Sequence, residues 1–141
     1  MSDAPFTLEH LDHVVLRTTD LEKMIAFYER LGAVVVRRME QFEMVQLRFG
    51  TSMLDLLASE HPVGADGEAE SRNLDHFAVR ITPYDEAAIL AFCEKRGIEA
   101  QPMKKLLGAD GFGPAVYLRD PEGNRVEVKG PPIEPPPDAS A

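Results

Sequence analysis

Two histidines and two carboxylates recur at matching places in the two halves of this chain. His13 lies in the segment LDHVVL, and His76 lies in the related segment LDHFAV. Further along each half, the triplet LDL around Asp55 matches the triplet VEV around Glu127. Imidazole and carboxylate groups are the ligands that divalent transition metals commonly take from proteins. The repeat therefore predicts a metal site to which each half contributes one histidine and one acid.

Alternation along the strands predicts which of these side chains meet. Successive side chains of a strand point to opposite faces of the sheet. His13 and His76 therefore lie opposite their apolar neighbours, and so do Asp55 and Glu127. We expect the apolar neighbours to pack beneath helices. The other face then carries all four candidate ligands, which converge if the two sheets curl towards one another.

An aspartate precedes each histidine and offers a second candidate pair. By alternation Asp12 and Asp75 point to the helix-covered side, where we expect a hydrogen bond to a turn or helix end. Arg17 and Arg80 lie four residues beyond the histidines and share their face. These arginines either hold an anionic substrate group or form salt bridges with acidic side chains.

The elements that must position these residues follow the order β-α-β-β-β twice. In the first half we expect strands at 11–17, 33–38, 43–49 and 53–58 and a helix at 21–31. In the second half we expect strands at 74–81, 98–102, 115–119 and 124–129, a helix from Thr82-Pro83 to about Arg96, and a loop at 107–114. The predicted fold is α+β: two βαβββ modules form a curled, incompletely closed mixed β-sheet barrel around a metal and substrate cavity, with helices outside.

The expected organisation is one domain with four parts. The first module spans 8–58 and the second spans 73–130. Residues 59–72 contain proline, glycine and acids without periodicity, which predicts a linker. The proline-rich tail, 131–141, cannot continue a sheet, and we expect it to be disordered.

Composition restricts the partners. The formal charge of −9 argues against nucleic acid and anionic membranes, which both need a basic footprint. The sequence has neither an apolar run approaching ~18 residues nor the layout of a signal peptide, and its single cysteine, Cys93, fits a reducing compartment. We therefore expect a cytoplasmic protein that acts on a small molecule. Open sheets with exposed edges favour a homodimer.

The duplicated βαβββ pattern, the Leu-Asp-His openings and the ending RDPEGNRVE at 119–127 resemble the vicinal oxygen chelate superfamily. That superfamily includes glyoxalase I, methylmalonyl-CoA epimerase, extradiol dioxygenases, fosfomycin-resistance thiol transferases and bleomycin-binding proteins. The resemblance covers about residues 8–130 and implies that His13, His76 and Glu127 bind a metal. Asp55 stands where glyoxalase I-like members have a metal-binding glutamate. Because its side chain is one methylene shorter, Asp55 is either a fourth ligand or the base that transfers a proton.

The resemblance implies a divalent transition metal (Zn, Ni, Mn, Co or Fe) that chelates vicinal substrate oxygens and stabilises an oxyanionic intermediate. The chain is most similar to glyoxalase I-type lyases and isomerases, with Asp55 and Glu127 as catalytic residues. Four side chains are expected to shape the substrate pocket: Gln46, Arg48, Tyr117 and Phe112.

Three alternatives stay open at this point. Two histidines and a carboxylate also suit the Fe²⁺ of an extradiol dioxygenase. A fosfomycin-type thiol transferase ranks lower, since the sequence has no distinct basic cluster for a phosphonate. A metal-free binding protein of the bleomycin-resistance type is disfavoured by the intact His/His/Glu set.

Overall fold

The computed structural model describes residues 2–30, 32–60, 73–119, 121 and 123–137. The chain divides into two compact units, and the divisions fall directly before the two histidines. The His13 unit comprises 13–75 and 137–141, and the His76 unit comprises 1–12 and 76–136. The fold class is mixed α+β, as the sequence predicts.

The His13 unit contains the first βαβββ module. Its elements are β1 (Thr7–Thr18, from His13 onward), α1 (Leu21–Arg30), β2 (Val34–Met39), the short 3-10 helix η1 (Glu40–Phe42), β3 (Met44–Phe49) and β4 (Ser52–Ala58). The strands lie in the order β2-β3-β4-β1. Strand β1 is parallel to β4, and the other neighbours are antiparallel.

The His76 unit repeats this topology. Its elements are β5 (Leu74–Thr82, from His76 onward), α2 (Glu86–Arg96), β6 (Ala100–Leu107), β7 (Phe112–Arg119) and β8 (Arg125–Lys129). The order is β5-β8-β7-β6, with β5 parallel to β8 and antiparallel neighbours beyond. The first strand of each module therefore lies beside the last, which brings each histidine strand next to an acid strand.

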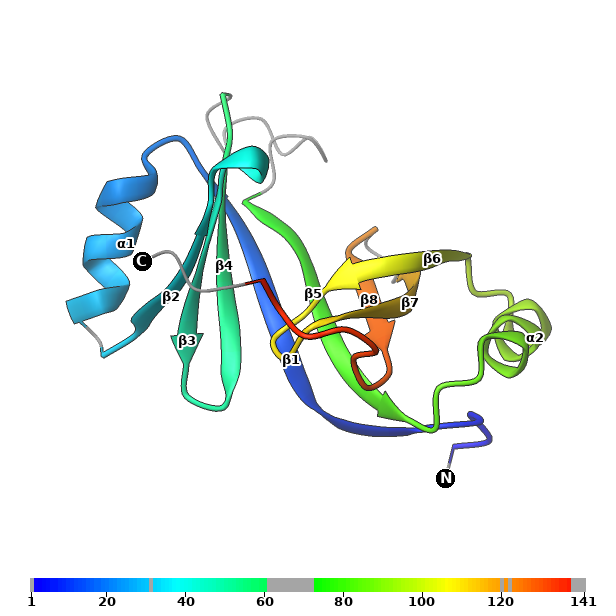
Figure 1. The fold of residues 1–141 in the computed structure, drawn as a ribbon. Helices are drawn as coiled ribbons and strands as arrows, with labels where there is room; N and C mark the ends of the chain where they lie inside the picture. The colour runs from blue at the N-terminus through cyan, green and yellow to red at the C-terminus, as the bar shows by residue number, and fades with distance from the viewer. Residues whose placement is uncertain (1, 31, 61–72, 120, 122, 138–141) are drawn as a thin grey trace. The chain divides into compact units, whose positions relative to one another are not determined.

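Each helix covers one face of the sheet in its own unit, and Figure 1 shows α1 alongside β2–β4. Ile25 of α1 packs on buried residues of β3 and β4, namely Val45, Leu47, Leu54 and Leu56. In the other unit, the buried side chains of α2 and the sheet are Ile81, Ile89, Cys93, Val116 and Val128. The predicted alternation is confirmed for the acids, because Leu54 and Leu56, which flank Asp55, and Val128, which follows Glu127, are among these core residues.

The helix ends follow from capping. The Asp20 carboxylate accepts from the backbone N–H of Lys23 at 3.1 Å and so caps the start of α1 at Leu21, as predicted. The expected start of α2 at Thr82-Pro83 is wrong. The helix begins at Glu86, because the Asp85 carboxylate accepts from the N–H of Ala88 at 3.1 Å and so caps the first turn. It ends as predicted at Gly97, which has a φ of 69°.

Three strand boundaries differ from the predictions. Strand β1 begins at Thr7, although residues 1–9 carry no strand signal. Strand β6 runs on to Leu107, and β7 begins at Phe112, so the predicted loop at 107–114 shrinks to 108–111. In the tail, expected to be disordered, Ile133 donates to the Phe112 carbonyl at 2.8 Å, and Phe112 donates to Glu134 at 2.9 Å. Backbone pairing with β7 fixes this part of the tail.

Several predicted features lie outside the described residues. These are Leu31 at the end of the first helix, linker residues 61–72, two positions of the turn before β8, and tail residues 138–141. Neither α1 nor α2, the helices of the described ranges, is long and apolar enough to span a membrane.

Candidate metal centre

The His76 unit places one histidine and one acid side by side. The Nε2 atom of His76 lies 3.2 Å from Oε1 of Glu127, and both residues are buried. Ala78 is the register partner of Glu127 in the parallel pair β5–β8, so His76, Ala78 and Glu127 share one face of the sheet. This face is the one opposite α2.

Tyr117 also lies on this face, because it is paired with Glu127 across β7 and β8. Its ring stands edge-on to the imidazole of His76, with centroids 5.6 Å apart, and the guanidinium of Arg125 lies 4.6 Å from the Tyr117 centroid. The Tyr117 ring thus limits the orientations open to His76. Tyr117 also lines a small hollow of about 50 Å³.

Phe112, expected at the substrate pocket, is placed differently. Alternation along β7 puts Phe112 on the opposite face from Tyr117. Its ring lies 4.9 Å from the Nζ atom of Lys105, and its backbone pairs with Glu134. Phe112 therefore does not share the face of His76 and Glu127.

The His13 unit has the same register. Val15 is paired with Asp55 in β1–β4, just as Ala78 is paired with Glu127 in the other unit. In both modules the acid is thus the partner of the residue two positions beyond the histidine. His13 and Asp55 are both buried, and they share the face opposite α1. Arg48, half-buried on β3, belongs to the same face.

Asp55 is the last member of a chain of buried hydrogen bonds. The side-chain amide Nε2 of Gln46 donates to Asp55 Oδ1 at 3.0 Å. The Gln46 carbonyl Oε1 accepts from Nη1 of Arg37 at 2.7 Å, and Arg37 Nε donates to the Pro137 carbonyl at 3.1 Å. Gln46 has no exposed surface, so its side chain supports Asp55 rather than an open pocket wall.

The two modules support their acids in different ways. Gln46 and Tyr117 are equivalent, since each is the β-partner of its module's acid. Gln46 gives Asp55 a hydrogen bond, whereas Tyr117 packs against the histidine that contacts Glu127. The repeat therefore keeps the positions of the acids while their neighbours diverge.

Each aspartate that precedes a histidine pairs with the arginine that follows the other histidine: Asp12 with Arg80, and Asp75 with Arg17. In the His76 unit, Asp12 Oδ1 lies 4.0 Å from Nε of Arg80, and Asp12 Oδ2 accepts from the N–H of Ala109 at 2.8 Å. In the His13 unit, Asp75 Oδ1 lies 3.8 Å from Nε of Arg17. Asp12 makes the expected turn hydrogen bond. The expected helix-covered side is not confirmed, because both aspartates lie beside arginines, which form the salt bridges named as their alternative role.

Two buried cations were not among the predicted site residues. Arg37 ends the hydrogen-bond chain to Asp55, and Lys129 is 1% exposed on the same face of β8 as Glu127. Lys129 follows Glu127 by two residues, so strand alternation could have predicted that the two side chains share one face. No sequence pattern marks Arg37, because its position depends on a β-bulge.

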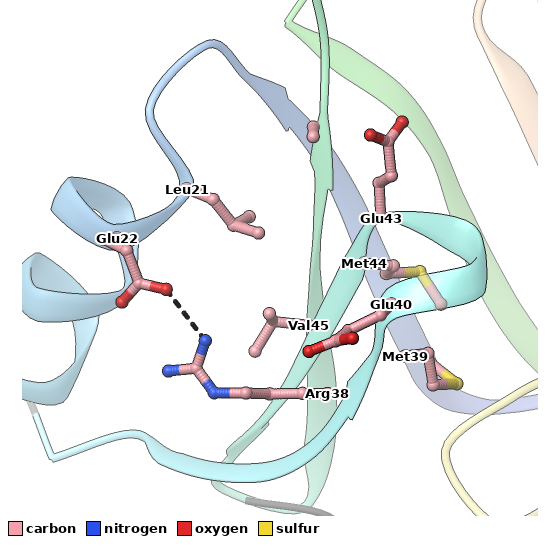
Figure 2. Close-up of a pocket in the computed structure, with 9 residues that line it drawn as sticks. Leu21, Glu22, Arg38, Met39, Glu40, Glu43, Met44 and Val45 are labelled. Atoms are coloured by element: carbon pink, nitrogen blue, oxygen red, sulfur yellow. Dashed lines mark hydrogen bonds and ion pairs between the residues drawn. The ribbon is translucent and has the colours of Figure 1, made fainter.

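A separate hollow of about 340 Å³ lies in the His13 unit, on the side of α1. Figure 2 shows Leu21, Val45 and the ion pair of Glu22 with Arg38, whose N and O atoms are 2.8 Å apart. Glu40 and Glu43 also line it. None of the predicted site residues lines this hollow.

Cys93 packs beneath α2 and has no part in the site. It is buried among the apolar side chains of its unit, and this burial raises the pKa of its thiol. A raised pKa leaves the thiol protonated at neutral pH, which is the opposite of an activated nucleophile. Cys93 therefore fills the core of its unit.

The separation of His76 and Glu127 fits metal coordination. Two donor atoms, each about 2.1 Å from one ion, lie about 3.0–3.4 Å apart at tetrahedral or octahedral angles. The observed 3.2 Å falls in this range. Neutral imidazole and a carboxylate form a donor set that a divalent transition ion accepts.

The chain belongs to the glyoxalase/bleomycin resistance protein/dioxygenase superfamily, whose family model matches residues 10–128. The sequence resemblance to the vicinal oxygen chelate superfamily is thereby confirmed.

Solved structures share the fold of this chain. Methylmalonyl-CoA epimerase from Mycobacterium tuberculosis is 17% identical with a TM-score of 0.61, over 88% of this chain and 89% of the epimerase. Homoprotocatechuate 2,3-dioxygenase from Brevibacterium fuscum, in complex with 3,4-dihydroxyphenylacetate, is 26% identical with a TM-score of 0.68. That match covers 96% of this chain but only 40% of the dioxygenase. A hypothetical protein from Bacillus halodurans is 17% identical with a TM-score of 0.61, over 92% of this chain and 97% of that protein.

Proposed function

We propose that this protein is a metal-dependent lyase or isomerase of the glyoxalase I-like kind, in which His13, His76 and Glu127 hold one divalent ion. Together these residues offer two imidazoles and one carboxylate. Zn, Ni, Mn, Co and Fe all accept such a set. The bound metal would supply a Lewis acid for a substrate oxygen. A cytoplasmic location and a homodimer are part of the same proposal.

The proposed substrate is a small molecule with oxygens on neighbouring carbons, such as a 2-hydroxycarbonyl compound. Family membership supports this class, since vicinal oxygens suit bidentate binding. In the proposed reaction Asp55 takes a proton from the hydroxyl-bearing carbon and returns it to the former carbonyl carbon, while the hydroxyl proton passes to the former carbonyl oxygen. Gln46 donates to Oδ1 of Asp55 and so holds the carboxylate in one orientation.

The observation that carries this proposal is the buried, hydrogen-bonded Asp55 on the same face of its sheet as His13. A carboxylate held in one orientation and shielded from water suits a reaction that moves a proton. Tyr117, edge-on to His76, would help to exclude water from the other side of the site.

The test is exchange of a substrate proton. Protein loaded with each of the five metals in turn is incubated in D₂O with 2-hydroxycarbonyl compounds, and loss of the C–H signal is followed by NMR. Metal-dependent exchange that disappears in Asp55→Asn is the expected result. Absence of exchange with every metal and every compound would defeat the proposal.

An extradiol dioxygenase is the second candidate. The 26% identity to homoprotocatechuate 2,3-dioxygenase and the two-histidine, one-carboxylate set favour it. In that case Fe²⁺-loaded protein would consume oxygen with a catechol such as 3,4-dihydroxyphenylacetate. An oxygen electrode distinguishes the two reactions, since proton exchange consumes no oxygen.

A further inference from the structure

Arg37, Gln46 and Asp55 form a row of buried polar residues across three neighbouring strands. Gln46 is the register partner of Arg37 on β2 and of Asp55 on β4. Arg37 is 7% exposed, Asp55 is 2% exposed, and Gln46 is completely buried. We infer that Arg37 is a positioning residue that fixes the side chain of Asp55 through the amide of Gln46. This inference rests on the proposed role of Asp55 in proton transfer.

A β-bulge places Arg37 in this row. Val34 is paired with Arg48 and Val35 with Leu47, so regular pairing would bring Val36 opposite Gln46. The register shifts between Val35 and Arg37, and Arg37 takes that place instead. A bulge inserts one residue into a strand and re-aims the side chains beyond it. Here it turns a guanidinium towards the acid-bearing face.

The chemistry of the three groups fixes the direction of every hydrogen bond. A guanidinium has only donors, so Arg37 needs the carbonyl oxygen of the Gln46 amide. The NH₂ group of Gln46 must then point the other way, towards Asp55, whose Oδ1 must accept. Without Arg37, the Gln46 oxygen loses the cationic donor that holds it, so the amide and the Asp55 carboxylate it contacts are less firmly fixed.

Arg37 is itself anchored. Its Nε donates to the carbonyl of Pro137 at 3.1 Å, and its Nη1 donates to Gln46 at 2.7 Å. A buried guanidinium that lacked such acceptors would be costly, whereas charge-assisted hydrogen bonds are the strong ones. The second module has no such arrangement, because Gln101 is the partner of Tyr117 there. The inference therefore concerns Asp55 alone.

The experiment compares Arg37→Gln with Arg38→Gln. Arg38 is the adjacent cation on the same strand, pairs with Glu22 on the opposite side and serves as the matched control. In metal-free, ¹⁵N-labelled protein, the side-chain NH₂ signals of Gln46 are assigned from their absence in Gln46→Leu. Arg37→Gln should shift these signals and accelerate their exchange with solvent at least about tenfold. Arg38→Gln should leave both unchanged.

Turnover gives the second readout. Removal of a residue that orients a site group commonly costs about 10–100-fold in activity. We expect kcat to fall by this factor in Arg37→Gln with KM nearly unchanged, and Arg37→Lys, which keeps a donor and its charge, to recover part of the loss. Gln46→Glu, which still pairs with Arg37 but offers Asp55 no amide donor, should lose turnover while remaining folded.

Two outcomes would overturn the inference. One is unchanged Gln46 amide signals and exchange in Arg37→Gln. The other is wild-type kcat in Gln46→Glu. The NMR readout needs neither metal nor substrate, so it still decides the role of Arg37 if the proposed reaction proves wrong.

Discussion

The Nε2 atom of His76 and Oε1 of Glu127 lie 3.2 Å apart, although the two residues stand on the first and last strands of their module. The parallel pairing of β5 with β8 creates this closeness. The same register brings Asp55 beside the strand of His13. In both modules, therefore, parallel pairing places the strand that carries the histidine next to the strand that carries the acid.

Loss of any one of the three proposed ligands should weaken metal binding. His13→Ala, His76→Ala and Glu127→Ala should each lower metal affinity at least about tenfold, because each removes one donor. Isothermal titration with Zn²⁺, Ni²⁺ or Mn²⁺ measures the effect. His10→Ala is the control, since His10 is exposed on the same strand as His13. Stoichiometric binding of unchanged affinity in all three variants would exclude this site.

Asp55→Asn should separate metal binding from turnover. The asparagine keeps an oxygen that can accept from Gln46 but loses the charge and the proton-accepting ability. We expect retained metal and lost proton exchange, whereas Asp55→Glu should keep activity. Metal loss as large as in Glu127→Gln would make Asp55 an ordinary ligand. Full activity in Asp55→Asn would remove it from the mechanism.

Gly108→Ala should destabilise the His76 unit. A Cβ atom at Gly108 would meet Nζ of Lys129, and it would lie 2.6 Å from Lys129 Cε and 2.7 Å from Asp12 Oδ2. Such overpacking commonly costs about 1–3 kcal/mol. Gly113→Ala is the milder comparison, because its Cβ would lie 3.3 Å from the backbone oxygen of Pro131, a tight contact that a shift of a few tenths of an ångström relieves. Urea unfolding compares the two, and equal stabilities would contradict the packing around Lys129.

Stability should fall in alkaline solution through Tyr84. Burial raises the pKa of the Tyr84 phenol from 10.0 to about 12, and the charge of Glu86 adds to the shift. Since the folded state holds this proton more tightly, the contribution is complete below about pH 10 and is lost as the pH rises through about 12. Tyr84→Phe should therefore make the free energy of unfolding fall less steeply over this range. If the free energy of unfolding fell equally steeply with pH in Tyr84→Phe and the wild type, Tyr84 would not be the source of the alkaline loss of stability.

Light scattering at micromolar concentration should give twice the chain mass of 15.6 kDa. Strand β2 is an edge strand of the sheet and exposes Val34, and Phe27 and Phe49 of the same unit are also exposed. Apolar groups at a strand edge favour pairing with a second chain. A mass of one chain would make the homodimer prediction wrong.

Much of the fold could be predicted because the chain repeats itself. The two Leu-Asp-His segments mark the first strands, and alternation correctly separates the helix-covered face from the face of His76 and Glu127. The matched registers of Asp55 and Glu127 follow from the same repeat. Strand alternation is a local property of the sequence with a period of two residues, so it can be recognised without knowledge of distant contacts.

The remaining features depend on partners that lie far away in the sequence. Phe112–Pro114 contains glycine and proline but joins β7, since the backbone of Phe112 pairs with Leu107 and Glu134. Arg37 reaches Gln46 only through a bulge, and the run VVVRR gives no sign of one. Hydrogen bonds between distant strands determine these placements, and local propensity does not report them.

The neighbouring first and last strands of each module also govern the order of events during folding. His76 meets Glu127 only after α2, β6 and β7 have been traversed and β8 has docked on β5. Contacts between residues so distant in sequence require closure of a long loop, and they form slowly. We therefore expect the His76–Glu127 contact, which joins the two ends of the second module, to form late in folding. A substitution that hinders the docking of β8 would delay the site without altering the finished protein.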